Sequence, residues 1–231
     1  MIDEVGARGA SASRTVGAAS SLVGGLRLPA DKSVAHRALL FNAMAEGEAE
    51  VTVSRPGEDV LSMAHVLEAL GAVESIGEGP AGFTRVRLRG GGTRKAAMLP
   101  GSGGEALDCG NAGTAMRLLM GALSGRAASA RLTGDGSLSS RPMERVAAPL
   151  RTVGAHIVTD DGHAPILVEG SRELVAAEHE LPVASAQVIG ALTLAALAAK
   201  GTTTITAPGP TRDHTERMLA WLGAPVRREG Y

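Results

Sequence analysis

Basic residues stand at positions in this sequence where helices are expected to begin. Residues 31–37 open an Ala/Leu-rich run and place Lys32 and Arg37 near the start of its helix. The helix macrodipole disfavours a cation in the first turn by roughly 0.3 to 1 kcal/mol, and a bound anion reverses that sign. The alternative is that Ser33 is simply the N-cap and that both cations are solvated.

A second expected helix start, residues 108–117, is rich in small side chains. The backbone N–H groups of such a turn can form an anion-binding nest at a helix N-terminus, which bulky side chains would block. The alternative is an ordinary Gly-Asn turn capped by Thr114. Cys109 lies in this run, but it has no adjacent base, so we expect a small buried hydrophobic residue rather than a nucleophile.

Two more helix starts carry polar or basic groups. Ser185 and Gln187 offer a hydroxyl and an amide, both of which can hydrogen-bond a neutral polyol. Arg141 is followed by Pro142, which favours the first position of a helix.

A last start places Arg212 just before Asp213 and Glu216, which have the spacing of a capping box. A single basic residue at such a position is more often an exposed surface residue than a ligand-binding one. Four of them at helix starts of a nearly neutral chain predict a site for a compact, multiply anionic small molecule.

The elements that must position these groups form a repeat. A helical run ends near a glycine and leads into a β-branched strand three times, and the glycines, Gly47, Gly125 and Gly201, lie 78 and 76 residues apart. We expect each of these glycines to end its helical run. Equivalent first helices then point their N-termini to the same end of the domain.

A second helix follows in each unit and closes on a Gly-Ala step, with glycine expected at the C′ position. These steps begin at Gly71, Gly154 and Gly223. Further strands follow in the first two units, so the unit reads helix, strand, helix, strand, strand. The third unit stops at Tyr231, and the chain is therefore expected to be the first part of a longer polypeptide.

Composition excludes several classes of protein. The 231 residues carry 23 Lys+Arg and 24 Asp+Glu. This net charge of −1 provides no positive field that would attract nucleic acid or an anionic membrane surface. The single cysteine excludes an internal disulfide, and the six histidines never fall at metal-ligand spacing. Without a signal peptide or a long apolar span, a cytoplasmic protein is predicted. Residues 1–21 are predicted to be a flexible tail or linker.

Three runs, residues 28–39, 110–117 and 140–143, closely resemble the 5-enolpyruvylshikimate-3-phosphate synthase family, and the resemblance extends through residues 184–187 and 211–216. It covers about residues 21–231. It implies an inside-out α/β barrel of three βαβαββ-type repeats, with residues 22–231 as the N-terminal domain and the second domain absent.

The resemblance also implies a reaction. In this family the enolpyruvyl group of phosphoenolpyruvate passes to the 5-hydroxyl of shikimate 3-phosphate through a tetrahedral ketal, releasing phosphate without metal or organic cofactor. By motif, the catalytic residue is Lys32, which reaches both substrates. The shikimate 3-phosphate site then comprises Lys32, Ser33, Arg37, Ser185, Gln187 and Arg212. The phosphoenolpyruvate site comprises Lys32, Gly113, Arg141 and Gln187. A methyl group at Gly113 is expected to crowd a compact ligand such as glyphosate.

The chain departs from the family pattern in two ways. Position 186 is Ala where many members have a second serine, so one phosphate hydrogen bond is expected to be absent or replaced. The family's catalytic aspartate and Lys-Glu pair belong to the second domain, so the isolated chain is expected to be inactive. The alternatives are a non-catalytic anion-binding half-domain and a UDP-N-acetylglucosamine enolpyruvyl transferase; Ser33 argues against the latter, which has asparagine there.

Overall fold

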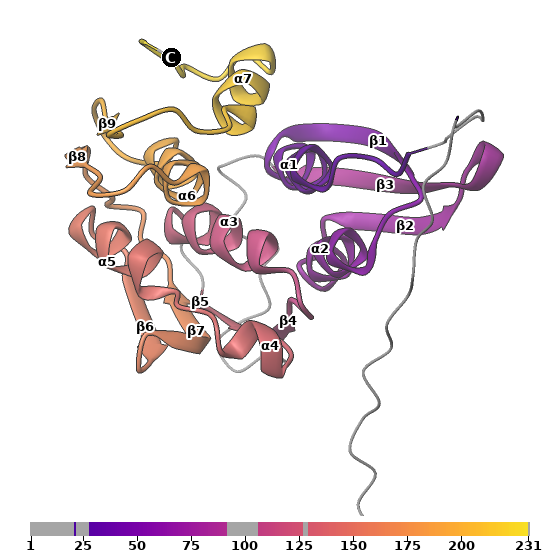
Figure 1. Ribbon diagram of the computed structural model, residues 1–231, viewed down its shortest axis with the longest axis horizontal. Coiled ribbons are helices and arrows are strands. Elements are labelled where there is room, and N and C mark those ends of the chain that lie inside the picture. The colour runs from indigo at the N-terminus through magenta and orange to yellow at the C-terminus, as the bar shows by residue number, and fades with distance from the viewer. Residues whose placement is uncertain (1–20, 22–27, 92–105, 127–128, 231) are drawn as a thin grey trace, which may run out of the picture.

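The computed structural model describes residues 21, 28–91, 106–126 and 129–230. The fold is mixed α/β. Helices occupy the middle of the molecule, and three separate sheets lie around them (Figure 1). The predicted α/β class and the predicted order of elements are both confirmed, unit by unit, below.

The first unit contains a three-stranded antiparallel sheet in the order β1-β3-β2. Its elements are α1 (Lys32–Met44), β1 (Glu46–Ser54), α2 (Glu58–Ala69), β2 (Val73–Glu78), the 3-10 turn η1 (Pro80–Gly82) and β3 (Phe83–Gly91). Arg85 and Arg87 of β3 pair with Glu50 of β1 at 3.2 and 3.4 Å. These half-exposed ion pairs mark the outer face of the sheet, while Val86 and Leu88 point inward.

The second unit adds one strand ahead of its first helix. Its elements are β4 (Leu107–Asp108), α3 (Gly113–Ser124), β5 (Ser129–Thr133), α4 (Gly136–Ser139), α5 (Glu144–Thr152), β6 (His156–Asp160) and β7 (His163–Glu169). The sheet order is β4-β5-β7-β6, with β4 parallel to β5 and the other pairs antiparallel. The unit therefore reads βαβαββ.

The third unit repeats the beginning of this pattern. It contains β8 (Glu178–Glu180), α6 (Ala186–Ala196), β9 (Thr204–Thr206) and α7 (His214–Trp221). β8 and β9 are parallel, as β4 and β5 are. The helix-strand-helix order predicted from the repeat is thus present three times.

The second helix of each unit ends in the same way. Gly71, Gly154 and Gly223 follow α2, α5 and α7 with φ of 74°, 95° and 83°. The amide of each following alanine bonds the carbonyl five residues earlier, as Ala72 does to Leu67 at 2.8 Å. This is a Schellman motif, in which glycine takes the left-handed conformation at lowest cost. The predicted C′ glycines are confirmed here.

The glycines after the first helices behave differently, and the prediction that each of them ends its helix is only partly confirmed. Gly125 directly follows α3 as its C-cap, with φ of −87°. Helix α1 already ends at Met44, and Gly47 lies inside β1 with φ of 102°. Gly201 follows the end of α6 by five residues. The prediction is therefore confirmed for Gly125 and wrong for Gly47 and Gly201.

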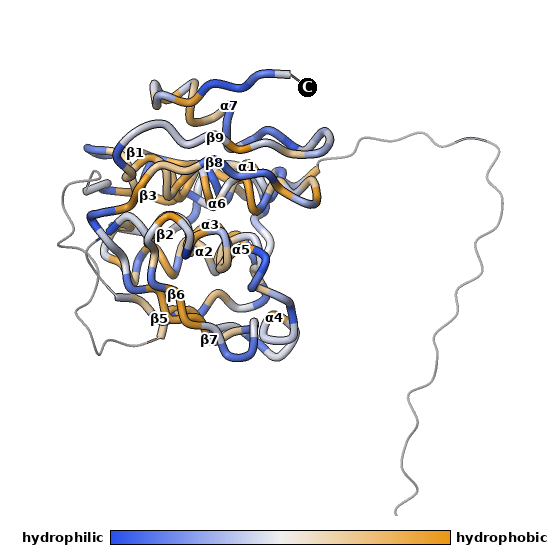
Figure 2. The backbone as a smooth tube through the Cα atoms, turned by 90° about the vertical axis from the view of Figure 1, so that its left-hand side faces the viewer, coloured by the Kyte–Doolittle hydropathy of each residue, from blue (hydrophilic) through white to orange (hydrophobic). Residues whose placement is uncertain are grey.

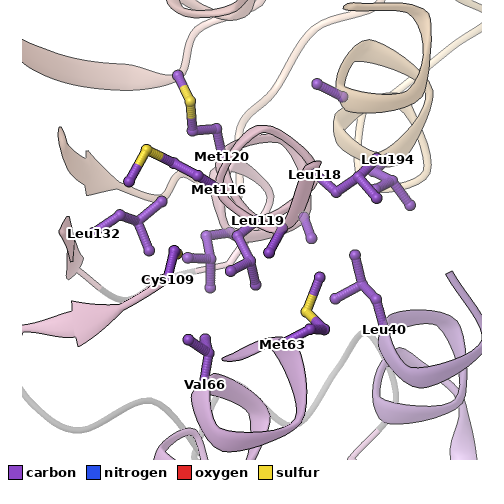
Figure 3. Close-up of a cluster of buried hydrophobic side chains, with 14 of the residues drawn as sticks. Leu40, Met63, Val66, Cys109, Met116, Leu118, Leu119, Met120, Leu132 and Leu194 are labelled. Carbon is purple, nitrogen blue, oxygen red and sulfur yellow. The ribbon is translucent and has the colours of Figure 1, made fainter. Parts of the chain in front are cut away.

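Helix α3 lies at the centre of the core, and eleven of its twelve residues are buried. Figure 3 shows Leu40 of α1, Met63 and Val66 of α2 and Leu194 of α6 around it. Cys109 belongs to the same cluster; burial raises the pKa of its thiol to about 12, which agrees with the expected buried hydrophobic role. In Figure 2 the hydrophobic colour follows the inner helices, whereas the segment after α7 is hydrophilic.

Small residues allow α3 and α6 to pack closely, as the composition predicts. A Cβ on Gly121 of α3 would lie 2.1 Å from the backbone oxygen of Ala191 in α6. Backbone cannot yield at that distance without a shift of one helix.

We predict that Gly121→Ala destabilises the chain by about 1 to 3 kcal/mol, because overpacking outweighs the higher helix propensity of alanine. Urea unfolding followed by circular dichroism measures the change. Gly77→Ala is the matched control, since a Cβ there meets nothing within 4 Å. Equal stability of the two variants would contradict the close helix contact.

Candidate anion-binding site

One cavity of about 480 Å³ opens where five helices begin. The N-terminal residues of α1, α3 and α6 line it, His214 adds the start of α7, and the acidic Asp59 adds the first turn of α2. The common end predicted for the three first helices is therefore confirmed. Each N-terminus contributes roughly half a positive charge and unpaired N–H groups to this end of the molecule.

Every site residue predicted from the sequence lines this cavity. The set is Lys32, Ser33, Arg37, Gly113, Arg141, Ser185, Gln187 and Arg212. The predicted proximity of Lys32, Arg37 and Arg141 is thus confirmed. The substrate that each of them holds stays a prediction.

The first turn of α1 is capped by Asp31, not by Ser33. The Val34 amide donates to Asp31 Oδ1 at 2.9 Å, and this hydrogen bond holds the pKa of the Asp31 carboxyl below its usual value. Ser33 is consequently the second helical residue, so the explanation of Ser33 as an N-cap is wrong. Lys32 Nζ lies 3.1 Å from Asp59 Oδ2 at the start of α2. The Lys32 side chain is 65% exposed and lines the cavity.

Arg37 is buried rather than solvated, with 3% of its surface exposed. Its Nε donates to Thr215 Oγ1 at 2.7 Å, and its Nη1 donates to the Ser33 carbonyl at 3.0 Å. Burial lowers the pKa of the guanidinium, although distant carboxylates partly oppose this. Within the described ranges, no carboxylate lies close enough to form an ion pair with it.

The turn before α3 holds an arginine and not a free nest of amides. The N–H groups of Gly110, Ala112 and Gly113 donate to Asp108 Oδ1, Cys109 O and Asn111 O at 2.8, 2.8 and 3.0 Å. The nest prediction is therefore wrong for these amides. Thr114 does not cap the helix either, because Ala112 is the N-cap and no side chain bonds there.

Asn111, in the same turn, accepts two hydrogen bonds from Arg141. Its side-chain oxygen accepts from Arg141 Nη2, and its carbonyl accepts from Nη1 at 3.3 Å. The Asn111 amide in turn donates to Asp135 Oδ2 at 2.8 Å. Pro142 is not the first residue of a helix: Arg141 follows the end of α4, and α5 begins only at Glu144. Arg141 therefore does not lie in the first turn of α5, and the expected unfavourable interaction with the dipole of that helix is absent.

Arg117 was missed in the sequence, although it lines the cavity. It is 5% exposed and donates to the carbonyls of Gly113 and Pro142 at 3.3 and 3.2 Å. Burial, followed by repulsion from Arg145 and Arg141, lowers its pKa to about 10. The spacing of Gly113 and Arg117 could have indicated that Arg117 belongs to the site, because residues i and i+4 of a helix share one face.

Gly113 makes room for two guanidinium groups. A Cβ there would lie 2.9 Å from Arg117 Nη1 and 3.1 Å from Arg141 Nη1. A methyl group would therefore displace these arginines, which refines the expectation that it would crowd the ligand directly.

The start of α6 closes another side of the cavity. Ser185 is the N-cap, and its hydroxyl accepts from the Val188 amide at a long 3.5 Å. Gln187 donates to Thr114 Oγ1 at 3.4 Å and accepts from Arg145 Nη2 at 3.2 Å. Gln187 therefore joins α6 to α3 and α5.

Asp213 is the N-cap of α7, but no side chain caps the helix. Its carboxylate pairs with Arg228 and, at 4.0 Å, with Arg217. The capping box predicted with Glu216 is therefore wrong. Arg212 is exposed at the rim of the cavity.

The arrangement favours an anionic ligand. Arg37 and Arg117 are buried cations whose partners on the chain are neutral oxygens. A buried charge without a counter-ion is costly, and a bound anion removes that cost. Among the described residues, no three His, Cys, Asp or Glu side chains gather closely enough to hold a metal ion.

The fold and the cavity define a three-unit α/β domain with a cationic site at converging helix N-termini. The chain belongs to the EPSP synthase (3-phosphoshikimate 1-carboxyvinyltransferase) family, whose model matches residues 16–231. A 3-phosphoshikimate 1-carboxyvinyltransferase of Alkalilimnicola ehrlichii is 47% identical over 212 residues, which is 91% of this chain and 46% of that protein. Its counterpart in Methylococcus capsulatus is 46% identical, over 94% of this chain and 48% of that protein.

A solved structure of EPSP synthase from Acinetobacter baumannii superposes with a TM-score of 0.78 and 44% identity. The match covers 90% of this chain and 45% of that one. The chain thus spans about half the length of the relatives that it matches. None of the helices in the described segments has the length and apolar character to cross a membrane.

We predict that Arg117→Met raises the unfolding free energy of the unliganded chain by about 1 kcal/mol, because it removes a buried cation without a carboxylate partner. The same change should reduce the stabilisation that added inorganic phosphate gives. Thermal unfolding with and without phosphate measures both effects. Arg131→Met, at an exposed position on β5, is the control, and a phosphate response unchanged in Arg117→Met would contradict the assignment.

Proposed function

We propose that this chain forms the shikimate 3-phosphate side of the active site of an enolpyruvyl transferase. The reaction moves the enolpyruvyl group of phosphoenolpyruvate to the 5-hydroxyl of shikimate 3-phosphate, a step in chorismate and aromatic amino-acid biosynthesis. The observation that carries the proposal is the convergence of all eight motif residues on one cavity. Membership of the EPSP synthase family supports the same substrate pair.

Shikimate 3-phosphate is assigned to the side of the cavity built from α1, α6 and the segment before α7. Ser33, Arg37, Ser185, Gln187 and Arg212 would bind it. Hydroxyl, amide and guanidinium groups together suit a polyol that carries a phosphate and a carboxylate. Ala186 supplies no hydroxyl, so the phosphate has one hydrogen-bond donor fewer than in relatives with serine there.

Phosphoenolpyruvate is assigned to the side formed by the turn before α3 and the segment between α4 and α5. Gly113, Arg141 and Gln187 would contact it, and the structure adds Arg117 to this group. Both guanidinium groups meet at Gly113, where a Cβ would intrude. Two fixed cations match a ligand that carries a phosphate and a carboxylate within a few bonds.

Lys32 is assigned the catalytic role because the family motif places it at both substrates and because it lines the same cavity as both groups. In the unliganded chain, Asp59 holds its ammonium at 3.1 Å. A mobile ammonium can leave this exposed pair at little cost and follow charge as it develops during addition of the hydroxyl and loss of phosphate. Proton transfer at the enolpyruvyl carbon has no assigned acid or base among the motif residues.

We further infer that the three units form an inside-out α/β barrel, as in the family. Helices inside and sheets outside support this fold. The division into residues 1–21 and 22–231, with a second domain supplying the rest of the site, stays a prediction that the length of the relatives supports. The cytoplasmic location also stays a prediction.

We predict that shikimate 3-phosphate binds the chain measurably in calorimetric titration, whereas phosphoenolpyruvate binds weakly. Charge-assisted hydrogen bonds contribute roughly 1.5 to 3 kcal/mol each before ordering costs, and most of the shikimate 3-phosphate partners lie on this chain. No binding at millimolar concentration would overturn the assignment. Phosphate release by the chain alone, at a rate comparable to a full-length relative, would show that the catalytic groups are misplaced. Binding without turnover after addition of the second domain would favour the non-catalytic alternative.

We predict that Gly113→Ala, in a chain complemented with the second domain of a relative, weakens glyphosate inhibition more than it lowers turnover. The added methyl group shifts Arg117 and Arg141, on which a compact anion depends. Steady-state kinetics of phosphate release with increasing glyphosate provide the measurement. Gly136→Ala is the control, because a Cβ at that position meets nothing within 4 Å. The same inhibition constant in Gly113→Ala and in the parent would refute the prediction.

A further inference from the structure

We propose that Thr215 is a positioning residue that orients Arg37 for its ligand. The inference rests on the proposed function, because it assigns Arg37 to shikimate 3-phosphate. Thr215 stands in the first turn of α7 and does not line the cavity. Its hydroxyl contacts the guanidinium of Arg37, a residue of α1.

The geometry fixes the plane of the guanidinium. Thr215 is 1% exposed, and its Oγ1 accepts from Arg37 Nε at 2.7 Å. The Ser33 carbonyl accepts from Nη1 at 3.0 Å. Two acceptors on different nitrogens of one planar group leave it a single orientation. In the described part of the chain, no hydrogen-bond acceptor serves Nη2, which remains for a ligand in the cavity that Arg37 lines.

The chemistry of the acceptor matters as much as its position. A carboxylate at this distance would hold the guanidinium equally well, but it would cancel the charge that an anionic ligand needs. A threonine hydroxyl supplies an acceptor without a charge. Thr215 thus holds Arg37 in place and leaves its positive charge available.

A glycine in a third helix makes space for this contact. A Cβ on Gly190 of α6 would lie 2.9 Å from Thr215 Oγ1, 3.0 Å from Leu118 Cδ2 of α3 and 3.6 Å from Arg37 Nη2. Alanine is the better helix former, so helix propensity does not account for glycine at this place. The absence of a side chain lets α6 pass the pair of residues without moving the hydroxyl.

The first test compares three variants in calorimetric titrations with shikimate 3-phosphate. Thr215→Val, which keeps the shape but removes the acceptor, should weaken binding about tenfold, the scale of one charge-assisted hydrogen bond. Thr215→Ser keeps the hydroxyl and should stay within about twofold of the parent. Thr193→Val is the matched control, because Thr193 is a buried threonine of α6 whose hydroxyl donates to the Ile189 carbonyl of the same helix.

A second measurement does not depend on the substrate. In the unliganded chain the Nε–H of Arg37, assigned with Arg37→Lys, should give a slowly exchanging ¹⁵N NMR signal. Thr215→Val should lose that protection, while Thr215→Ser and Thr193→Val should keep it. Urea midpoints of all variants identify any that fails to fold. If Thr215→Val fails, Thr215→Ala, which removes the hydroxyl and adds no atom, takes its place.

The two readouts separate the possible failures. Equal affinity of Thr215→Val and the parent, or equal weakening by Thr215→Ser and Thr215→Val, would overturn the positioning role. If the parent itself does not bind shikimate 3-phosphate, the proposed function fails, and the NMR signal alone then decides the role of Thr215. Protection of Arg37 that survives Thr215→Val would overturn the role in that case too.

Discussion

The site depends on buried guanidinium groups that the chain holds with neutral oxygens. Arg37 has a threonine hydroxyl and a carbonyl as partners, and Arg117 has two carbonyls. Burial lowers the pKa of both side chains, which means that the folded chain bears a cost for their charge. A multiply charged anion would relieve this cost, and this is the physical basis of the proposed ligand class.

The repeat explains how one chain brings these cations together. Three first helices begin at the same end, and the interior that they share with α2, α5 and α7 combines large Leu and Met side chains with glycine at the closest helix contact, as at Gly121. Each second helix ends in a Schellman turn, and after α2 and α5 the chain continues into a strand of an outer sheet. In the proposed function, the three units differ in the residues at the starts of their first helices. These are Lys32 and Ser33 in the first unit, Gly113 in the second, and Ser185 and Gln187 in the third.

The sequence predicted the repeat and the α/β class from periodicity and the spacing of glycines. The site residues, all of which line the cavity, were predicted from their places at expected helix starts and from the family motifs. The sequence mispredicted the helix caps and turns, where several neighbouring groups compete for the same hydrogen bond. Asp31 outcompetes Ser33 as the cap, and the amides expected to form a nest bond their own turn. Arg117 was missed because it lies within an apolar helical run, and only the approach of Pro142 and Arg141 shows that its face meets the cavity. Thr215 could not be found from the sequence, since its partner is 178 residues away.

The most direct test of this account is a crystal structure of the chain with shikimate 3-phosphate. The account predicts the ligand in the cavity, with Arg37 and Ser185 within hydrogen-bond distance of its oxygens and with Thr215 still bonded to Arg37 Nε. A ligand seated elsewhere would contradict it. So would a carboxylate of the chain paired with Arg37 in the complex, because the buried charge would then be needed by the fold and not by the ligand.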